Sequence, residues 1–185
     1  MPSEKERMLR GELYRASDPE LVADAARCHR LLERYNATGI DEEAERAAIL
    51  RELLADVGDG VVIRPRLSMD YGSQTRIGAG TFINVGAVIL DVARVTIGAD
   101  VQIGPNVQLL TPTHPLEPAL RRSGVEAAEP ISIGDNAWLG GGVIVCPGVS
   151  IGADTVVGAG AVVASDLPAG VLAVGNPARV IRELA

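Results

Sequence analysis

The sequence predicts a mainly β fold, a parallel β-helix, preceded by a helical segment. Aliphatic residues recur every six residues after Gly60, whereas apolar residues before that point recur at helical spacing. Aromatic residues make up only 3% of a chain that is 47% hydrophobic. A core of Val, Ile, Leu and Ala indicates a narrow, repetitive packing space, and 185 residues suffice for one principal fold with a small appendage.

The helical segment is expected to span residues 1–58, and its first long helix is expected to begin near Ser17. Ser17 and Glu20 match a capping box, and Pro19 suits the first turn of a helix that runs to about Asn36. The apolar residues that recur at helical spacing are Leu21, Ala25, Cys28 and Leu32. This pattern is typical of an amphipathic helix.

A second helix is predicted from about Asp41 to Val57, and Gly58 is its stop signal. The residues expected to face inward are Ala44, Ala47, Ala48, Leu50 and Leu53. The change from a helical to a six-residue period then marks the start of the second part of the fold.

Residues 59–175 are predicted to form the β-helix. The aliphatic positions of the repeat are Ile77, Ile83, Ile89, Ile97, Ile103, Leu109, Ile133, Leu139, Val145, Ile151, Val157 and Val163. Glycine follows them at positions 78, 98, 104, 134, 140, 152 and 158, where a turn favours a residue free of Cβ restrictions. Each six-residue unit describes one short strand plus a turn, and three units close a triangular coil. A sandwich or barrel is the alternative, but its strands usually recur every 8–12 residues or so.

An interruption separates Leu109 from the next regular repeat. Its length keeps the phase of the repeat, because Leu109 and Ile133 are 24 residues apart, which is four repeats. Residues 110–130 are rich in Pro, Glu and Arg and cannot pack inside a β-helix, so they are predicted to project as a loop.

Charge and composition exclude several classes of function. The net charge of −7 and the absence of a basic, aromatic-rich run argue against a nucleic-acid surface. No apolar signal region follows the charged N-terminus, and no window approaches about 18 consecutive apolar residues, so a cytoplasmic protein without membrane spans is expected. Cys28 and Cys146 match neither a disulfide framework nor a metal motif and are expected to be apolar fillers.

Several stretches resemble the hexapeptide-repeat acetyltransferases, which are left-handed parallel β-helices. They are Ile133-Gly-Asp-Asn-Ala-Trp138, Pro147-Gly-Val-Ser-Ile-Gly152, Val157-Gly-Ala-Gly-Ala161 and Gly175-Asn-Pro-Ala-Arg-Val-Ile-Arg182. The helical front and Leu110-Thr-Pro-Thr-His-Pro115 are similar to the maltose and galactoside O-acetyltransferases. This resemblance, which covers nearly the whole chain, implies the left hand of the helix, a homotrimer, acetyl-CoA as co-substrate, no metal, and transfer to a hydroxyl of a sugar or similar acceptor.

His114 is the candidate general base. It lies on the projecting loop, and imidazole has a suitable pKa for removing a hydroxyl proton near neutral pH. The resemblance implies direct transfer in a ternary complex, and no Ser or Cys of the chain lies in a recognisable nucleophile motif. Cys146 is therefore not expected to be a nucleophile. His29 lies within the first long helix, where a structural or solvent-exposed role is favoured.

The resemblance implies further residues at the acceptor. Asn84 would lie near the reacting hydroxyl and acetyl group, although Asn also suits a left-handed turn. Asp91 is expected to protrude beside an insertion and to bind a polyol, while Val92 replaces a second acidic residue that the family often has. Asp70 and Asp18 resemble other hydroxyl-binding positions; Asp70 is otherwise a turn carboxylate, and Asp18 otherwise supports the helix N-terminus.

The resemblance also implies a cofactor site. Trp138 would line the pantetheine channel, while Gly141 and Ala159 would offer backbone N–H groups to the thioester and pantetheine. Arg179 and Arg182, on a short helix expected over residues 176–185, could meet the CoA phosphates. Ala164 and Ser165 stand where the family usually has a Thr-Lys pair, so one phosphate-facing cation is missing.

Three other functions compete with O-acetyl transfer. A γ-class carbonic anhydrase shares the fold but needs three imidazoles at a metal, and the chain has two His. A non-catalytic assembly module explains the repeats but not the loop, Trp138 and the Arg residues together. Acyl transfer to an amine of a nucleotide sugar or antibiotic is the third; the helical front favours a sugar hydroxyl instead.

Overall fold

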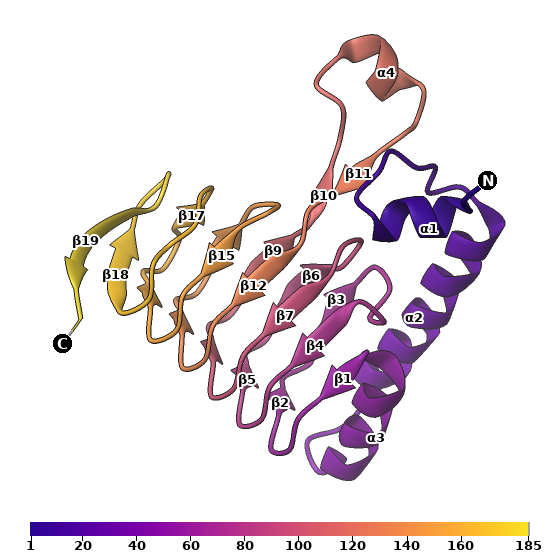
Figure 1. Ribbon diagram of the computed structural model, residues 1–185. Coiled ribbons are helices and arrows are strands. Elements are labelled where there is room, and N and C mark those ends of the chain that lie inside the picture. Colours follow the sequence, from indigo (N-terminus) through magenta and orange to yellow (C-terminus); the bar gives the residue numbers. More distant parts are fainter. Residues whose placement is uncertain (185) are drawn as a thin grey trace.

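Three parallel β-sheets run along a solenoid of triangular coils, as the sequence predicts (Figure 1). The computed structural model describes residues 1–184. The first sheet consists of β1 (Asp56–Val57), β4 (Thr75–Ile77), β7 (Val95–Ile97), β12 (Ile131–Ile133) and β15 (Ser150–Ile151). The third consists of β3 (Ser68–Met69), β6 (Val88–Leu90), β9 (Gln108–Leu110), β14 (Ile144–Val145) and β17 (Val162–Val163). The fold is the expected left-handed parallel β-helix.

The second sheet is the longest and ends in an antiparallel pair. Its strands are β2 (Val62–Ile63), β5 (Phe82–Ile83), β8 (Gln102–Ile103), β13 (Trp138–Leu139), β16 (Val156–Val157), β18 (Val171–Val174) and β19 (Arg179–Glu183). The helix expected over residues 176–185 is therefore wrong, because Arg179–Glu183 pairs antiparallel with β18. The exposed backbone edge of the last coil provides hydrogen bonds that a short terminal helix would not use, and Val180 and Ile181 favour a strand.

The predicted repeat positions form the core of the solenoid. All twelve aliphatic residues of the repeat are at most 3% exposed, and each stacks on its equivalent in the next coil, as Ile77 does on Ile97. Each of these side chains is Ile, Leu or Val, so the core is a continuous stack of aliphatic side chains, an aliphatic ladder, that leaves no room for aromatic rings.

The glycines that follow the aliphatic positions serve close stacking rather than a special backbone conformation. Gly78 and Gly134 do not have positive φ, but a Cβ on Gly78 would lie 2.5 Å from the backbone of Gly98, and one on Gly134 would lie 2.8 Å from Cα of Ala153. The left-handed turn positions are instead held by other glycines, such as Gly80 and Gly86, and by Asp100, Asn106, Asn136 and Asp154, whose φ is 56–59°. The backbones of adjacent coils therefore pass too close at these corners for any side chain.

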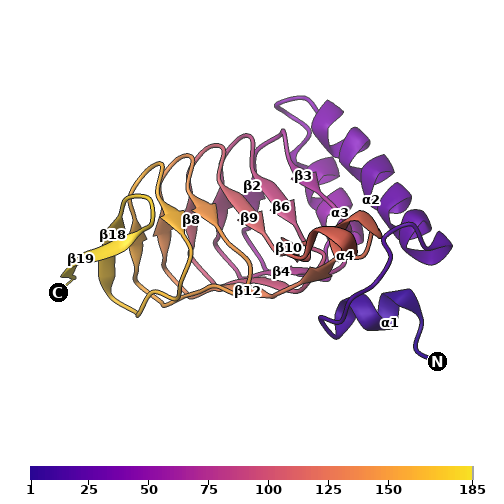
Figure 2. The same cartoon turned by 90° about the horizontal axis from the view of Figure 1, so that it is seen from above.

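Two helices, α2 (Pro19–Ala37) and α3 (Glu43–Leu53), cover the first coil at one end of the solenoid (Figure 2). A further helix, α1 (Glu4–Leu9), was not predicted and contacts α2. Asp18, not Ser17, caps α2, because its carboxylate accepts a bond from Glu20 N. Asn36 at the end of α2 fixes the first coil through two hydrogen bonds with the backbone of Leu67, at 2.8 and 2.9 Å. None of the helices among the described residues is long and apolar enough to cross a membrane.

The second predicted helix is shorter than expected. α3 ends at Leu53, and Asp56–Val57 already forms β1, whose partner is β4. Leu50 and Leu53 are buried as predicted, and Ala47 is half-buried. Ala44 and Ala48 are exposed, contrary to the prediction, because the buried stripe is completed by Ile49.

The interruption of the repeat projects from the solenoid as predicted (Figure 1). This arm begins with β10 (Pro112–Thr113), continues into α4 (Pro118–Arg122) and returns through β11 (Ala127–Ala128), which pairs antiparallel with β10. The N-terminal segment contacts its base, since Tyr14 and Glu126 form an antiparallel bridge. The arm is thus held at its base from two sides.

We predict that Gly134→Ala lowers the free energy of unfolding by about 2–3 kcal/mol, because the new Cβ would overlap backbone that cannot move without separating two coils. The matched control is Gly39→Ala, where the nearest atom to a Cβ is Glu42 Oε2 at 3.5 Å; its effect should be about 1 kcal/mol or less. Urea denaturation followed by circular dichroism measures both. Equal effects of the two substitutions would contradict the close-stacking explanation.

Candidate active site

Two separate hollows contain half of the predicted site residues. The first, which we call the arm pocket, has a volume of about 560 Å³ and lies where the arm, α2 and the turn after β3 meet. Its lining is Ala16, Leu21, Val22, Ala25, Ala26, His29, Asp70, Tyr71, Leu90, Val92, Pro112, His114 and Glu126. The second, the solenoid groove, has a volume of about 530 Å³ and runs along one corner of the coils. The two linings share no residue.

His114 reaches the arm pocket from the residue after β10, and its side chain is 60% exposed. The hairpin pairs Thr113 with Ala127, so the next pair outward places His114 opposite Glu126. Their closest atoms, His114 Nδ1 and Glu126 Oε2, are 3.8 Å apart. Sequence reasoning missed Glu126. A hairpin register for the loop would have suggested it, but the loop sequence shows no strand pattern.

Asp70, for which the resemblance implied hydroxyl binding, lines the arm pocket and is half-buried. Burial, followed by the nearby charges of Asp91 and Glu126, raises the pKa of its carboxyl to about 6, while His29 opposes this rise. Burial likewise raises the pKa of Tyr71 to about 12, so this hydroxyl stays a hydrogen-bond donor. His29 itself is exposed on α2 at the rim of the pocket, as its solvent-exposed interpretation expected.

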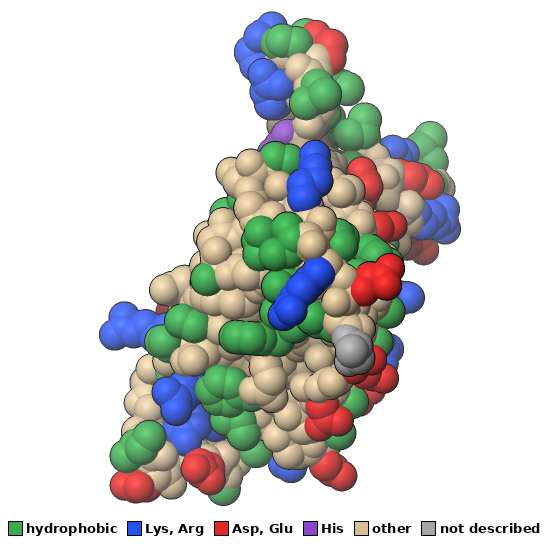
Figure 3. All heavy atoms as spheres, turned by 90° about the vertical axis from the view of Figure 1, so that its left-hand side faces the viewer, with side chains coloured by type: hydrophobic (Ala, Val, Ile, Leu, Met, Phe, Trp, Pro, Cys, Tyr) green, Lys and Arg blue, Asp and Glu red, His purple; other side chains and the backbone are tan. Residues whose placement is uncertain are grey.

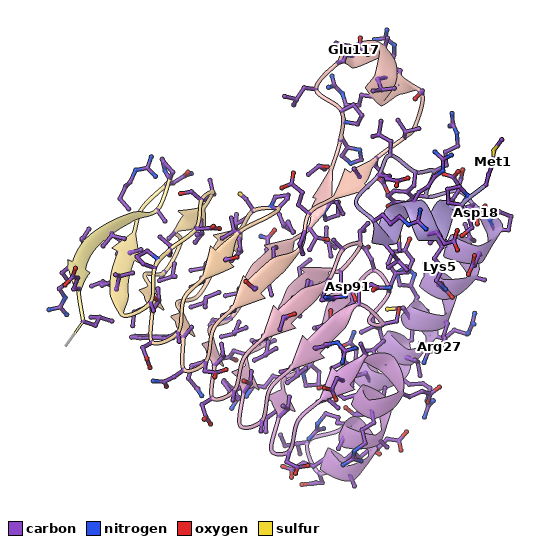
Figure 4. All side chains as sticks on the ribbon, in the orientation of Figure 1. Met1, Lys5, Asp18, Arg27, Asp91 and Glu117 are labelled. Carbon is purple, nitrogen blue, oxygen red and sulfur yellow. The ribbon has the colours of Figure 1, made fainter. Side chains whose placement is uncertain are left out.

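Asp91 does not protrude, and the expectation that it does is wrong. Its side chain is fully buried between the solenoid and the turn after β3 (Figure 4). Its carboxylate accepts hydrogen bonds from the backbone N–H groups of Tyr71, Gly72 and Gln74 and from the Thr75 hydroxyl, at 2.9–3.2 Å. Burial raises its pKa and these four donors oppose that rise. Asp91 therefore organises the turn that carries Asp70 and Tyr71.

Neither Asp18 nor Val92 offers a free acidic group to the arm pocket. Asp18 caps α2 and lies at the start of that helix (Figure 4), outside the lining of the arm pocket. This agrees with its alternative interpretation as a helix N-terminal residue. Val92 is 4% exposed and gives the pocket an apolar wall where the family often has an acid.

The solenoid groove brings together Asn84, Trp138, Gly141 and Ala159. One side is the column of outward residues Phe82, Gln102, Trp138, Val156 and Leu172, which the strand registers place above one another. Along the corner, Asn84 is followed in successive coils by Gly104, Gly140 and Gly158. Because three of these four positions lack a side chain, the corner is an open channel parallel to the solenoid axis.

Two features of the groove suit a long ligand with amide groups. Trp138 is 55% exposed on the groove wall, so it is not a core residue. Within residues 1–184, the N–H groups of Gly141 and Ala159 donate to no backbone carbonyl and remain available to a ligand. Asn84 is not in the left-handed region, which excludes its alternative role as a left-handed turn residue, and its Oδ1 accepts a bond from Val85 N at 2.8 Å.

The remaining predicted cofactor residues lie outside the groove. Ala164 and Ser165 are exposed after β17, and Arg179 and Arg182 are exposed on β19. Arg182 pairs with Leu172, which lines the groove, so β19 runs along the C-terminal end of the channel. Figure 3 shows this end of the solenoid, where basic, acidic and apolar side chains lie among backbone and other side chains.

The described residues contain no cluster of three His, Cys, Asp or Glu side chains that could hold a metal ion. Cys28 is fully buried, as predicted for an apolar filler, and burial raises the pKa of its thiol to about 12, which disfavours the thiolate. Cys146 is only half-buried.

Comparison with known families agrees with both parts of the chain. Residues 7–58 match the maltose acetyltransferase hexapeptide capping motif, and residues 130–165 match the bacterial transferase hexapeptide of six repeats. Nodulation protein L of Rhizobium leguminosarum bv. viciae is 54% identical over 96% of this chain and 94% of its own. Galactoside O-acetyltransferase of Escherichia coli K12 is 37% identical over 97% of this chain and 88% of its own.

Solved structures show the same architecture over the full chain. A maltose O-acetyltransferase from Clostridium difficile 630 superposes with a TM-score of 0.99 at 43% identity, covering 100% of this chain and 98% of its own. A hexapeptide-repeat acetyltransferase from Vibrio cholerae, solved in complex with acetyl-coenzyme A, superposes with a TM-score of 0.93 at 40% identity, covering 100% of both chains.

We predict that Asp70→Asn stabilises the protein in a pH-dependent way. The pKa of Asp70 is raised in the folded state from 3.8 to about 6, so the folded state keeps a proton that the unfolded chain releases between these values. Ionised Asp70 therefore costs stability, and the cost grows as pH rises from about 4 to 6 and then stays constant.

The gain in melting temperature from Asp70→Asn should accordingly be larger at pH 8 than at pH 4.5. Asp59→Asn, which removes the same charge from an exposed turn, is the control. A gain that does not depend on pH, or that matches the control, would show that the carboxylate is fully solvated.

Proposed function

The chain belongs to the hexapeptide-repeat acetyltransferases that begin with a maltose acetyltransferase capping motif, and on that premise we propose that it moves acetyl from acetyl-CoA to a sugar hydroxyl, with His114 as general base. It is an acetyltransferase by this membership. The observation that carries the finer proposal is the division of the site residues between two hollows. One has a base and hydroxyl-binding groups, and the other has an open channel with free N–H groups.

In the proposed reaction, His114 accepts the proton of the acceptor hydroxyl while that oxygen bonds to the thioester carbon. The tetrahedral oxyanion that forms is stabilised by hydrogen-bond donors, for which the Asn84 amide and the free N–H of Gly141 are the candidates. Collapse then breaks the C–S bond, and the thiolate leaves with the proton from the His114 imidazolium. No covalent enzyme intermediate is required.

The solenoid groove is the proposed site of the pantetheine arm. From Asn84 to Gly158 the corner spans three coil spacings, roughly 15 Å at the spacing of adjacent strands. Pantetheine contains two amides, which can accept hydrogen bonds from Gly141 and Ala159, and Trp138 offers an apolar wall. At the C-terminal end of the channel, Arg179 and Arg182 would meet the CoA phosphates, with Ala164 and Ser165 contributing contacts but no charge.

A homotrimer is part of the proposal, because His114 and Asn84 line different hollows of one chain. If one subunit places its arm pocket against the solenoid groove of the next, the base and the thioester meet at the interface. The projecting arm supports this arrangement: Leu116 at its tip is 92% exposed and Leu120 in α4 is 40% exposed, so both have apolar surface available to a neighbour.

The acceptor is proposed to be a carbohydrate. Asp70, Tyr71 and His29 give the arm pocket hydrogen-bonding groups on one side, and Leu21 and Val92 give it an apolar wall on the other. Sugars present this combination of hydroxyl groups and apolar ring faces. Asp91 supports this surface indirectly through the turn that it binds, and Asp18 through the start of α2.

We expect His114→Ala to lower kcat by roughly 10²–10⁴-fold, the usual loss for a general base. Release of free thiol from acetyl-CoA is measured with a panel of mono- and disaccharides and with matched amino sugars. CoA affinity should be unchanged, because His114 is not among the groove residues proposed to bind pantetheine or the CoA phosphates. Full activity of the variant would refute the role of His114, and transfer to amines but not to hydroxyls would favour the N-acetyltransferase alternative.

Subunit mixing tests whether the site is shared. His114→Ala and Asn84→Ala are each expected to be nearly inactive alone. When the two are unfolded together at a 1:1 ratio and refolded, about one quarter of the interfaces in a random cyclic trimer combine an intact His114 with an intact Asn84. Recovery to about a quarter of wild-type activity is expected. No recovery in mixed oligomers would show that each site is built within one chain.

A further inference from the structure

The segment before α2 contacts the arm pocket through Tyr14. This residue is 1% exposed, although it lies in an otherwise exposed connection between α1 and α2. Its N–H donates to the Glu126 carbonyl at 3.0 Å, and Glu126 N donates back to the Tyr14 carbonyl at 3.1 Å. In addition, the Tyr14 hydroxyl donates to Glu126 Oε1. Three hydrogen bonds thus join two residues that are 112 positions apart in the chain.

The two carboxylate oxygens of Glu126 have different neighbours. Oε1 is held by the Tyr14 hydroxyl, while Oε2 is the atom nearest to His114 Nδ1, at 3.8 Å. The Glu126 side chain is only 20% exposed, whereas that of His114 is 60% exposed. A carboxylate held by Tyr14 therefore faces one nitrogen of a more exposed imidazole.

We propose that Tyr14 and Glu126 are positioning residues that hold His114 in the tautomer and orientation required for catalysis. This inference rests on the proposed role of His114 as general base. A carboxylate beside Nδ1 favours the tautomer with a proton on Nδ1, which leaves the Nε2 lone pair free to accept the acceptor's proton. Tyr14 acts on Glu126 alone: by binding Oε1 it keeps Oε2 turned to the imidazole.

The rest of the N-terminal segment fixes Tyr14 against the arm. Next to Tyr14, the guanidinium of Arg15 donates a hydrogen bond to the Ser123 carbonyl at 2.7 Å. The backbone N–H of Arg15 donates to the Glu4 carboxylate at 2.6 Å. Glu4 is the first residue of α1, and a capping box of Ser3 and Glu6 stabilises the N-terminus of this helix. Burial, followed by the hydrogen bond to Glu126, raises the pKa of Tyr14, so its hydroxyl remains a donor throughout the range of any assay.

Tyr14→Phe removes the hydroxyl and keeps both the ring and the backbone bridge. We expect kcat to fall roughly tenfold, which corresponds to loss of one hydrogen bond to a charged group. KM for acetyl-CoA should not change, because Tyr14 is not among the residues that line the groove. Glu126→Gln, which keeps the size of the side chain but removes its charge, should lower kcat by at least as much.

Tyr35→Phe is the matched control. Tyr35 is also fully buried, and its hydroxyl donates to the Ile63 carbonyl at 2.5 Å, but it lies in the core between the helices and the first coil. Both Tyr→Phe variants lose one hydrogen bond from a buried tyrosine and should lose similar stability in urea denaturation. Only Tyr14→Phe should lower kcat. An equal decrease of kcat in both variants would show that Tyr14 has a structural role only.

Nitrogen-15 spectra of the imidazoles provide a direct readout. The chain has two His, and the signals of His29 are assigned with a His29→Gln variant. At a pH where His114 is neutral, its Nδ1 should be the protonated nitrogen in the wild type, and the proportion of the other tautomer should rise in Tyr14→Phe and Glu126→Gln. Unchanged tautomers together with unchanged kcat would overturn the inference.

The inference and the proposed function fail in different ways. If His114→Ala retains full activity, the general-base role is wrong. If His114→Ala is inactive while Tyr14→Phe and Glu126→Gln have the kcat of the wild type, the base stands and the positioning role of Tyr14 and Glu126 is wrong.

Discussion

The close stacking of successive coils is the constraint on which the rest of this structure depends. Each coil must place an aliphatic side chain on the one below it and must bring its backbone against the next at the corners. Gly78 and Gly134 show how little space remains there, since even a methyl group would overlap the neighbouring backbone. A chain under this constraint has few places for functional side chains: the outer faces of the strands, the corners, and insertions that leave the solenoid.

The candidate site uses all three places. Trp138 stands on an outer face, Asn84 and the free N–H groups of Gly141 and Ala159 lie along one corner, and His114 is on an insertion. The absence of side chains permits close stacking at Gly104, Gly140 and Gly158, and the same three glycines line the channel beside Trp138. The groove is therefore a direct consequence of how the solenoid packs.

Periodicity predicted most of the fold because the solenoid repeats one local solution, and all twelve predicted aliphatic positions are buried. It failed where contacts come from outside the repeat. Asp91 lies beside an insertion, and its burial depends on four hydrogen-bond donors of the segment that follows β3. No local sequence pattern predicts that these donors meet at Asp91. The C-terminal strand likewise depends on the free edge of the last coil. Glu126 was not predicted, because its position opposite His114 follows from the register of the β10–β11 hairpin, which the loop sequence does not indicate.

The two hollows differ in what holds their shape. The walls of the solenoid groove are fixed by strand register and coil spacing, so a substitution on one strand leaves the channel in place. The arm pocket is assembled from α2, the turn organised by Asp91 and the base of the arm, three segments joined by specific polar contacts rather than by the aliphatic ladder. Its core contacts form a separate apolar cluster that includes Tyr14, Leu21, Tyr71 and Val92. Side chains of the arm pocket such as Val92 consequently lie outside the aliphatic ladder, so a substitution there acts on the pocket rather than on the channel.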